Sequence, residues 1–135
     1  MLKFCSLVVL ALFSSSSFPQ DSPFAFRNNN RPSFEEQITV EKLSEKLAEG
    51  GVILLDVRLK EDFDKNPILI PGATYVDPEY LPRWSTSLSA GSKVVVYCVA
   101  GKWVSQKVAL LLKEQGIDVS SLSGGIEAWN QSNNQ

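Results

Sequence analysis

The sequence predicts an α/β fold in which a parallel sheet is flanked by helices. Short apolar runs rich in β-favouring residues alternate along the chain with stretches that have the periodicity of amphipathic helices. Two of these runs, 52–57 and 94–97, are almost continuously apolar, which is typical of strands buried on both faces of a parallel sheet. Strands separated by helices of this length indicate parallel pairing through crossover connections. The sequence contains no internal repeat and indicates one domain.

Each element is bounded by local signals. The predicted strands are 36–39, 52–57, 74–76, 94–97 and 117–122. Thr39 is a suitable N-cap for a helix whose apolar face is formed by Val40, Leu43 and Leu47, and Gly50 follows its end. The remaining predicted helical segments are a short charged helix or turn at 59–65, a short piece at 77–81, a core-facing helix through 104–112 that ends before Gly116, and a last helix at 126–131.

Composition excludes several functional classes. The chain has 135 residues, a formal net charge of -2 and no basic run, so it is a poor candidate for binding nucleic acid. It contains no histidine, which excludes a Cys-His pair, a Ser-His-Asp triad and any metal site built on histidine. No metal site and no cofactor are predicted.

The two ends of the chain are expected to lie outside the domain. Residues 1–20 resemble a signal peptide, with Lys3 before an apolar stretch and a run of serines after it, and this predicts export to a periplasm or the cell exterior. The apolar run is too short to span a bilayer, so no stable membrane insertion is expected after processing. Residues 21–34 are rich in Pro, Asn and Ser and are predicted to be a flexible linker. The domain is expected at 35–131, followed by a polar tail at 132–135.

The segment with the strongest chemical signal surrounds Cys98. This cysteine follows the predicted strand 94–97 directly, and a short loop containing Gly101 leads from it into a helix. Ligands bind at the carboxyl edge of parallel sheets, and the backbone N–H groups of such a loop can form a nest for an anion. A nearby helix N-terminus also favours thiolate over thiol. Because the chain's other cysteine, Cys5, lies in the predicted leader, Cys98 would be left without a disulfide partner.

Four neighbouring residues each have two interpretations. Lys102 is either a cation that steers an anionic substrate or a solvated surface residue. Trp103 either forms a wall of the pocket or packs beside it, and packing is preferred. Asp56 and Arg58 follow another strand and either line the site or form an internal ion pair that fixes the neighbouring loops, with the ion pair preferred.

Four motifs in order resemble the rhodanese-like domain family. They are Leu54-Leu55-Asp56-Val57-Arg58, Ile70-Pro71-Gly72-Ala73, Val95-Val96-Tyr97-Cys98 with Gly101, and Leu122 to Trp129. The resemblance covers about residues 35 to 131. It implies a five-stranded parallel sheet flanked by helices and a sulfurtransferase that carries sulfane sulfur as a persulfide on Cys98. The implied partners are a small anionic donor, similar to thiosulfate or mercaptopyruvate, and an external acceptor, which is cyanide, a thiol or a protein.

The loop departs from the family pattern. Many single-domain members have an arginine and a serine after the cysteine and another arginine at the end of the loop, where this chain has Val99, Ala100 and Trp103. Leu69 also stands where many members have histidine. The predicted substrate-binding residues are Val99, Ala100, Gly101, Lys102, Trp103 and Arg58. The alternative is a catalytically inactive rhodanese-like module for binding or sensing. A related cysteine phosphatase is excluded because no arginine follows Cys98 through Leu112.

Overall fold

A computed structural model of the chain describes residues 23–28 and 30–134. The predicted signal peptide lies outside these residues. The strands are β1 (Gln37–Ile38), β2 (Ile53–Asp56), β3 (Ala73–Tyr75), β4 (Lys93–Tyr97) and β5 (Asp118–Leu122). The helices are α1 (Pro23–Phe26), α2 (Val40–Glu49), α3 (Lys60–Lys65), the 3₁₀ helix η1 (Pro78–Tyr80), α4 (Leu81–Ser85), α5 (Trp103–Glu114) and α6 (Gly125–Asn133).

The five strands form one parallel sheet in the order β1-β5-β4-β2-β3, which confirms the predicted fold class. Strand β4 lies at the centre, with Val94 to Tyr97 paired with β2 and Lys93 to Val96 paired with β5. Its residues Val94 to Tyr97 are all buried, as expected for a strand covered on both faces. Because every strand runs the same way, the carboxyl ends of β2 and β4 meet at one edge of the sheet.

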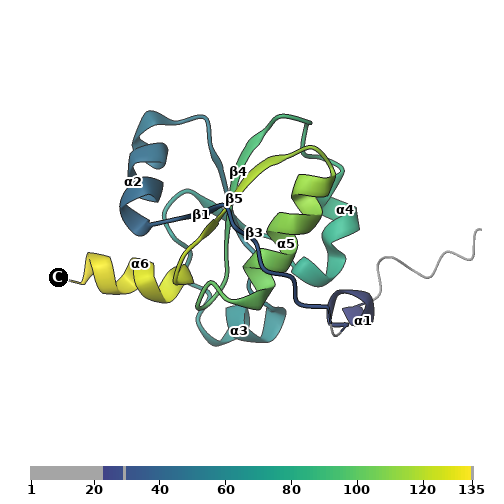
Figure 1. Ribbon diagram of the computed structural model, residues 1–135. Coiled ribbons are helices and arrows are strands. Elements are labelled where there is room, and N and C mark those ends of the chain that lie inside the picture. The colour runs from purple at the N-terminus through teal and green to yellow at the C-terminus, as the bar shows by residue number, and fades with distance from the viewer. Residues whose placement is uncertain (1–22, 29, 135) are drawn as a thin grey trace, which may run out of the picture.

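Two apolar layers hold the helices against the sheet. On one face, Val40 and Leu43 of α2 and Ile126 of α6 pack against Leu54 and Val95. The other face carries α5 and α4, whose buried residues include Val108, Leu112 and Leu81. Figure 1 shows α2 and α6 on one side of the sheet and α4 and α5 on the other.

Helix α2 forms as its sequence predicts. Thr39 is the N-cap, and its Oγ1 accepts a hydrogen bond from the backbone N–H of Lys42 at 3.2 Å. The helix ends at Gly50, whose N–H donates to the carbonyl of Lys46 at 3.1 Å. Helix α4 was not predicted as a separate element; the indole N–H of Trp84 donates to the carbonyl of Asp77 at 2.8 Å and ties this helix to the preceding loop.

Part of the segment 21–34, which the sequence predicts to be a flexible linker, packs against the domain. Phe26 and Phe34 are only 6% and 3% exposed and belong to the core on the α5 face. The Pro- and Asn-rich composition predicted flexibility. Two aromatic side chains nevertheless provide enough apolar surface to anchor a short segment. We call residues 26–28 and 30–34 the arm. Helix α6 also continues to Asn133, two residues beyond the predicted domain boundary. Among the described residues, no helix is long and apolar enough to cross a membrane.

Candidate functional site

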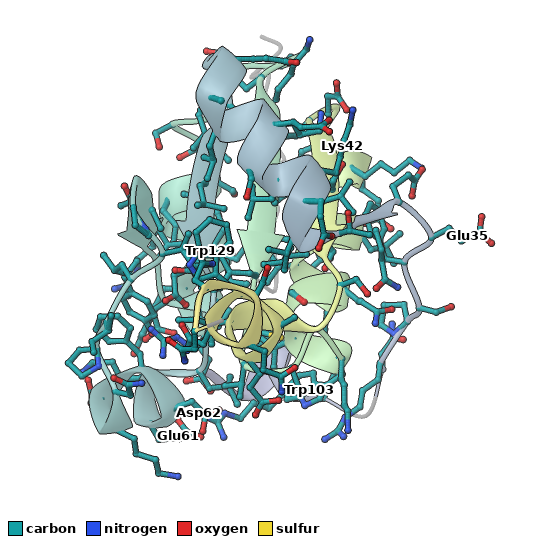
Figure 2. The ribbon with its side chains drawn as sticks, turned by 90° about the vertical axis from the view of Figure 1, so that its left-hand side faces the viewer. Glu35, Lys42, Glu61, Asp62, Trp103 and Trp129 are labelled. Atoms are coloured by element: carbon teal, nitrogen blue, oxygen red, sulfur yellow. The ribbon has the colours of Figure 1, made fainter. Side chains whose placement is uncertain are left out.

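Cys98 lies immediately after β4, at the carboxyl edge of the sheet, and the loop of residues 98–102 connects it to α5. Its side chain is buried, with 5% of the residue exposed, and it borders a cavity of about 170 Å³. The cavity is lined by Arg58, Leu59, Asp62, Cys98, Val99, Ala100, Lys102, Trp103 and Val104. Figure 2 shows Asp62 and Trp103 at the same end of the molecule, below α6. The structure therefore brings together five of the six predicted substrate-binding residues around the predicted nucleophile.

Two buried serines form a chain of hydrogen bonds that begins at the sulfur of Cys98. The Sγ atom of Cys98 lies 3.2 Å from Ser105 Oγ on α5, and Ser121 Oγ on β5 donates to Ser105 Oγ at 3.1 Å. Both serines are completely buried. A hydroxyl rotates to suit its partners. Since Ser121 already donates to Ser105, the proton of Ser105 is free to point at an ionised sulfur.

Helix α6 holds the first two residues of the loop. The N–H of Ile126 donates to the carbonyl of Cys98 at 2.9 Å, and the N–H of Glu127 donates to that of Val99 at 3.1 Å. These donors belong to the first turn of α6, whose N–H groups have no partner within the helix. Gly125, at φ +60°, allows the approach, because a Cβ there would lie 2.5 Å from both carbonyl oxygens.

Gly101 is the one predicted substrate-binding residue that lies outside the lining of the Cys98 cavity. It is buried and does not line the Cys98 cavity; a Cβ on it would lie 2.7 Å from Gly124 N and Leu122 O. Its φ of +69° also favours glycine. Gly101 therefore lets the loop pack against the turn between β5 and α6.

Arg58 lies in the cavity wall, but its guanidinium is engaged elsewhere. Its Nε lies 3.0 and 2.9 Å from the two carboxylate oxygens of Asp56, and its Nη2 lies 2.6 Å from Oδ2. The same group donates to the carbonyls of Asn66 at 2.8 Å and Ile68 at 3.1 Å. Arg58 is 2% exposed and Asp56 is fully buried. This is the internal ion pair that the sequence analysis preferred, and it fixes the loop after α3.

Two other charged residues line the cavity, an exposed lysine and a half-buried aspartate. Lys102 is exposed at the end of the loop, and Asp62, on α3, lies 4.0 Å from Lys65. Trp103 is half-buried and packs against Phe26, with their ring centroids 5.8 Å apart, so it both lines the cavity and packs. In the described part of the chain, the backbone N–H groups of residues 99–103 donate to no acceptor. They are available to an anion held at the sulfur.

The sequence model of the rhodanese-like domain family matches residues 39–132. The chain belongs to the rhodanese-like domain family. The matched segment contains the whole sheet except β1, and it contains the Cys98 loop and both serines.

Solved structures of rhodanese-like proteins share this fold. A rhodanese-like domain protein from Staphylococcus aureus is 30% identical and superposes with a TM-score of 0.62, covering 70% of this chain and 91% of that one. The rhodanese-like domain of an Anabaena protein is 31% identical, with a TM-score of 0.60 and coverage of 73% and 75%. A rhodanese-related protein from Thermoplasma volcanium, 21% identical, shows the same fold with a TM-score of 0.62 over 73% and 93% of the two chains.

Several site residues escaped sequence reasoning. Leu59 and Asp62 reach the cavity from the segment after β2, and Ser105 and Ser121 contact the sulfur or its partner from two other elements. A serine on a helix or a strand carries no sequence signal for such a contact, so the sequence offered no means of finding Ser105 or Ser121. No cluster of three or more His, Cys, Asp or Glu residues that could hold a metal ion occurs among residues 23–28 and 30–134.

Proposed function

We propose that this rhodanese-like domain is a sulfurtransferase that carries sulfane sulfur as a persulfide on Cys98. The observation that carries the proposal is the position of Cys98, which combines a cavity of about 170 Å³ with a serine hydroxyl at 3.2 Å and a loop of unpaired N–H groups. These groups stabilise negative charge on sulfur, first on the thiolate and then on the persulfide.

Loading is a nucleophilic displacement. The Cys98 thiolate attacks the outer sulfur of a donor such as thiosulfate, and a new bond forms between Sγ and that sulfur. The sulfur–sulfur bond of the donor breaks, and sulfite leaves with its electron pair. With mercaptopyruvate, the carbon–sulfur bond breaks and the carbon takes a proton to give pyruvate. In both cases Cys98 retains one additional sulfur atom.

Discharge requires an external acceptor. Cyanide or a thiolate attacks the outer sulfur of the persulfide, and Cys98 leaves as the thiolate. The only described cysteine is Cys98, so no second thiol in this part of the chain can resolve the persulfide. A small thiol or a partner protein is the proposed physiological acceptor.

A second candidate function is a catalytically inactive binding or sensing module. The observation that favours it is the charge balance of the cavity: Arg58 is neutralised by Asp56, Asp62 adds a carboxylate, and the loop itself contributes one cation, Lys102. A dianionic donor would bind weakly to such a wall.

Intact-protein mass spectrometry separates the two functions. The protein is incubated with thiosulfate or, separately, with mercaptopyruvate, beside the control variant Cys98→Ser. A sulfurtransferase gains the mass of one sulfur atom, which is lost on addition of cyanide and absent from the variant. If the folded protein gains no sulfur from either donor, the result contradicts the sulfurtransferase function and favours the binding or sensing module.

We also propose that the protein is exported. The support is the sequence pattern of residues 1–20 alone. Expression of the full chain with a C-terminal tag, followed by N-terminal sequencing of the exported fraction, tests it; a product that retains Lys3 would contradict it.

A further inference from the structure

We propose that the arm, residues 26–28 and 30–34, completes the sulfur-donor site by placing Arg31 beside Lys102 as an anion subsite. This inference rests on the proposed function for its biological meaning, but its geometry is independent of it. The arm precedes the family match, which begins at residue 39. It contacts the domain at Trp103 and Gln106, beside the loop that follows Cys98.

The arm is fixed to the domain at both of its ends. Phe26 and Phe34 are buried in the core on the α5 face. Between them, the buried Nζ of Lys107 on α5 donates to the carbonyl of Phe26 at 2.5 Å and to Asn28 Oδ1 at 2.6 Å. Such contacts hold the backbone of the arm along α5, so the position of Arg31 follows from the fold.

A single amide connects the arm to the Cys98 loop. The side chain of Gln106 accepts a hydrogen bond from the N–H of Phe34 at 3.0 Å and donates to the carbonyl of Gly101 at 3.0 Å. The arm and the loop therefore share one rigid partner on the first turn of α5.

Arg31 reaches the loop by stacking on Trp103. Its Cζ lies 4.5 Å from the centroid of the Trp103 ring, within the range of a cation–π interaction. Arg31, Gly101, Lys102 and Trp103 line a second cavity of about 260 Å³. Lys102 and Trp103 also line the Cys98 cavity, so the two cavities adjoin. In the described part of the chain, Arg31 forms no ion pair with a carboxylate. Burial lowers the pKa of Lys107, and the charge of Arg31 acts in the same direction.

The chemistry of the donor requires such a subsite. Thiosulfate is a dianion and mercaptopyruvate carries a carboxylate, while the guanidinium of Arg58 is already paired with Asp56. Arg31 and Lys102 both line the adjoining cavity, where the two cations are positioned to meet an anionic group. Many family members have an arginine where this chain has Trp103. Arg31 would supply that positive charge instead, because it stacks on the Trp103 ring.

The test compares two alkylating reagents that differ in charge. Iodoacetate is an anion and iodoacetamide is neutral, and both react with the Cys98 thiolate without any sulfur donor. We expect Arg31→Ala to reduce the ratio of the iodoacetate rate to the iodoacetamide rate about threefold, and Lys102→Ala to reduce it similarly, because each removes one screened charge near the sulfur. Salt at about 0.5 M should reduce the wild-type ratio toward that of the variants. Lys42→Ala, an exposed lysine on α2, is the matched control and should leave the ratio unchanged.

If the ratio of the iodoacetate rate to the iodoacetamide rate is the same in Arg31→Ala and in Arg31→Gln as in the wild-type protein, the proposal is overturned. Persulfide loading is then measured on the same variants with thiosulfate and with mercaptopyruvate. A larger loss with thiosulfate identifies an inorganic dianion as the ligand of the subsite, and a larger loss with mercaptopyruvate identifies an organic carboxylate. If the alkylation ratio falls as expected but wild-type protein gains no sulfur, the subsite stands and the proposed function fails. If the wild-type protein and Arg31→Ala gain sulfur equally and have the same alkylation ratio, the proposed function stands and the subsite fails.

Discussion

The Sγ atom of Cys98, the first residue of the loop, lies 3.2 Å from the Oγ atom of Ser105 on α5, beyond the other end of the loop. Ser121, on β5, donates to the same hydroxyl at 3.1 Å. The sulfur is therefore backed by a buried pair of hydroxyls, and it faces the cavity on its other side. This arrangement leads to the first prediction.

Ser105→Ala should slow alkylation of Cys98 by iodoacetamide at slightly acid pH by about tenfold, because a hydrogen bond to a charged group contributes on the order of 1.5 kcal/mol. Ser121→Ala should have a smaller effect, since it acts through Ser105. Ser120→Ala changes the neighbouring half-buried residue of β5 and is the control. Equal rates in the Ser105 and Ser120 variants would show that the hydroxyl pair does not act on the sulfur.

The buried ion pair should dominate the stability of this edge of the sheet. Asp56→Asn leaves the Arg58 guanidinium without its counter-charge in the core and should lower the free energy of unfolding by about 3–5 kcal/mol. Asp64→Asn removes an exposed partner of Lys60 and should cost less than about 1 kcal/mol. Urea denaturation of the two variants measures the difference. Similar losses in both would contradict the role assigned to the buried pair.

The contact between α6 and the loop predicts a difference between two glycines. Gly125 and Gly116 both have positive φ, but a Cβ meets two carbonyl oxygens at Gly125 and open space at Gly116. Gly116→Ala should therefore cost about 1–2 kcal/mol from backbone strain alone. Gly125→Ala should cost more and should also slow alkylation of Cys98, because the loop must move. An alkylation rate unchanged in Gly125→Ala would mean that α6 does not fix the position of the sulfur.

Tyr97 gives a prediction on pH. Burial raises the pKa of its hydroxyl above the usual value of 10.0, with the nearby Asp56 carboxylate acting in the same direction. The folded state then holds the proton more tightly than the unfolded state, so this stabilisation is present below about pH 10 and is lost as the pH rises further.

In Tyr97→Phe, the free energy of unfolding measured with urea should fall less between about pH 9 and pH 11 than it does in the wild-type protein. At neutral pH the same variant should cost about 1–3 kcal/mol, because the buried N–H of Ile70 loses its acceptor at 3.1 Å. Parallel losses of stability in both proteins above about pH 10 would assign the pH dependence to other groups.

Local sequence patterns were enough to predict the sheet and to place Cys98 at its carboxyl edge. Apolar runs such as 94–97 are long enough to be read as strands buried on both faces, and Cys98 follows directly where a parallel strand meets a loop. The cap at Thr39 and the pairing of Asp56 with Arg58 were also predictable, because their partners lie two or three residues away in the chain.

Only the tertiary structure decided what surrounds the sulfur. Ser121 lies 16 residues from Ser105, and Arg31 lies far along the chain from the Trp103 ring on which it stacks. The arm was expected to be solvated from its composition, yet Phe26 and Phe34 bury it against α5. Local patterns carry information about neighbours in sequence, whereas these contacts depend on the crossing of separate elements. The contacts are stabilised by burial and by pairing between elements that are distant in sequence, so they cannot be predicted from any one short segment.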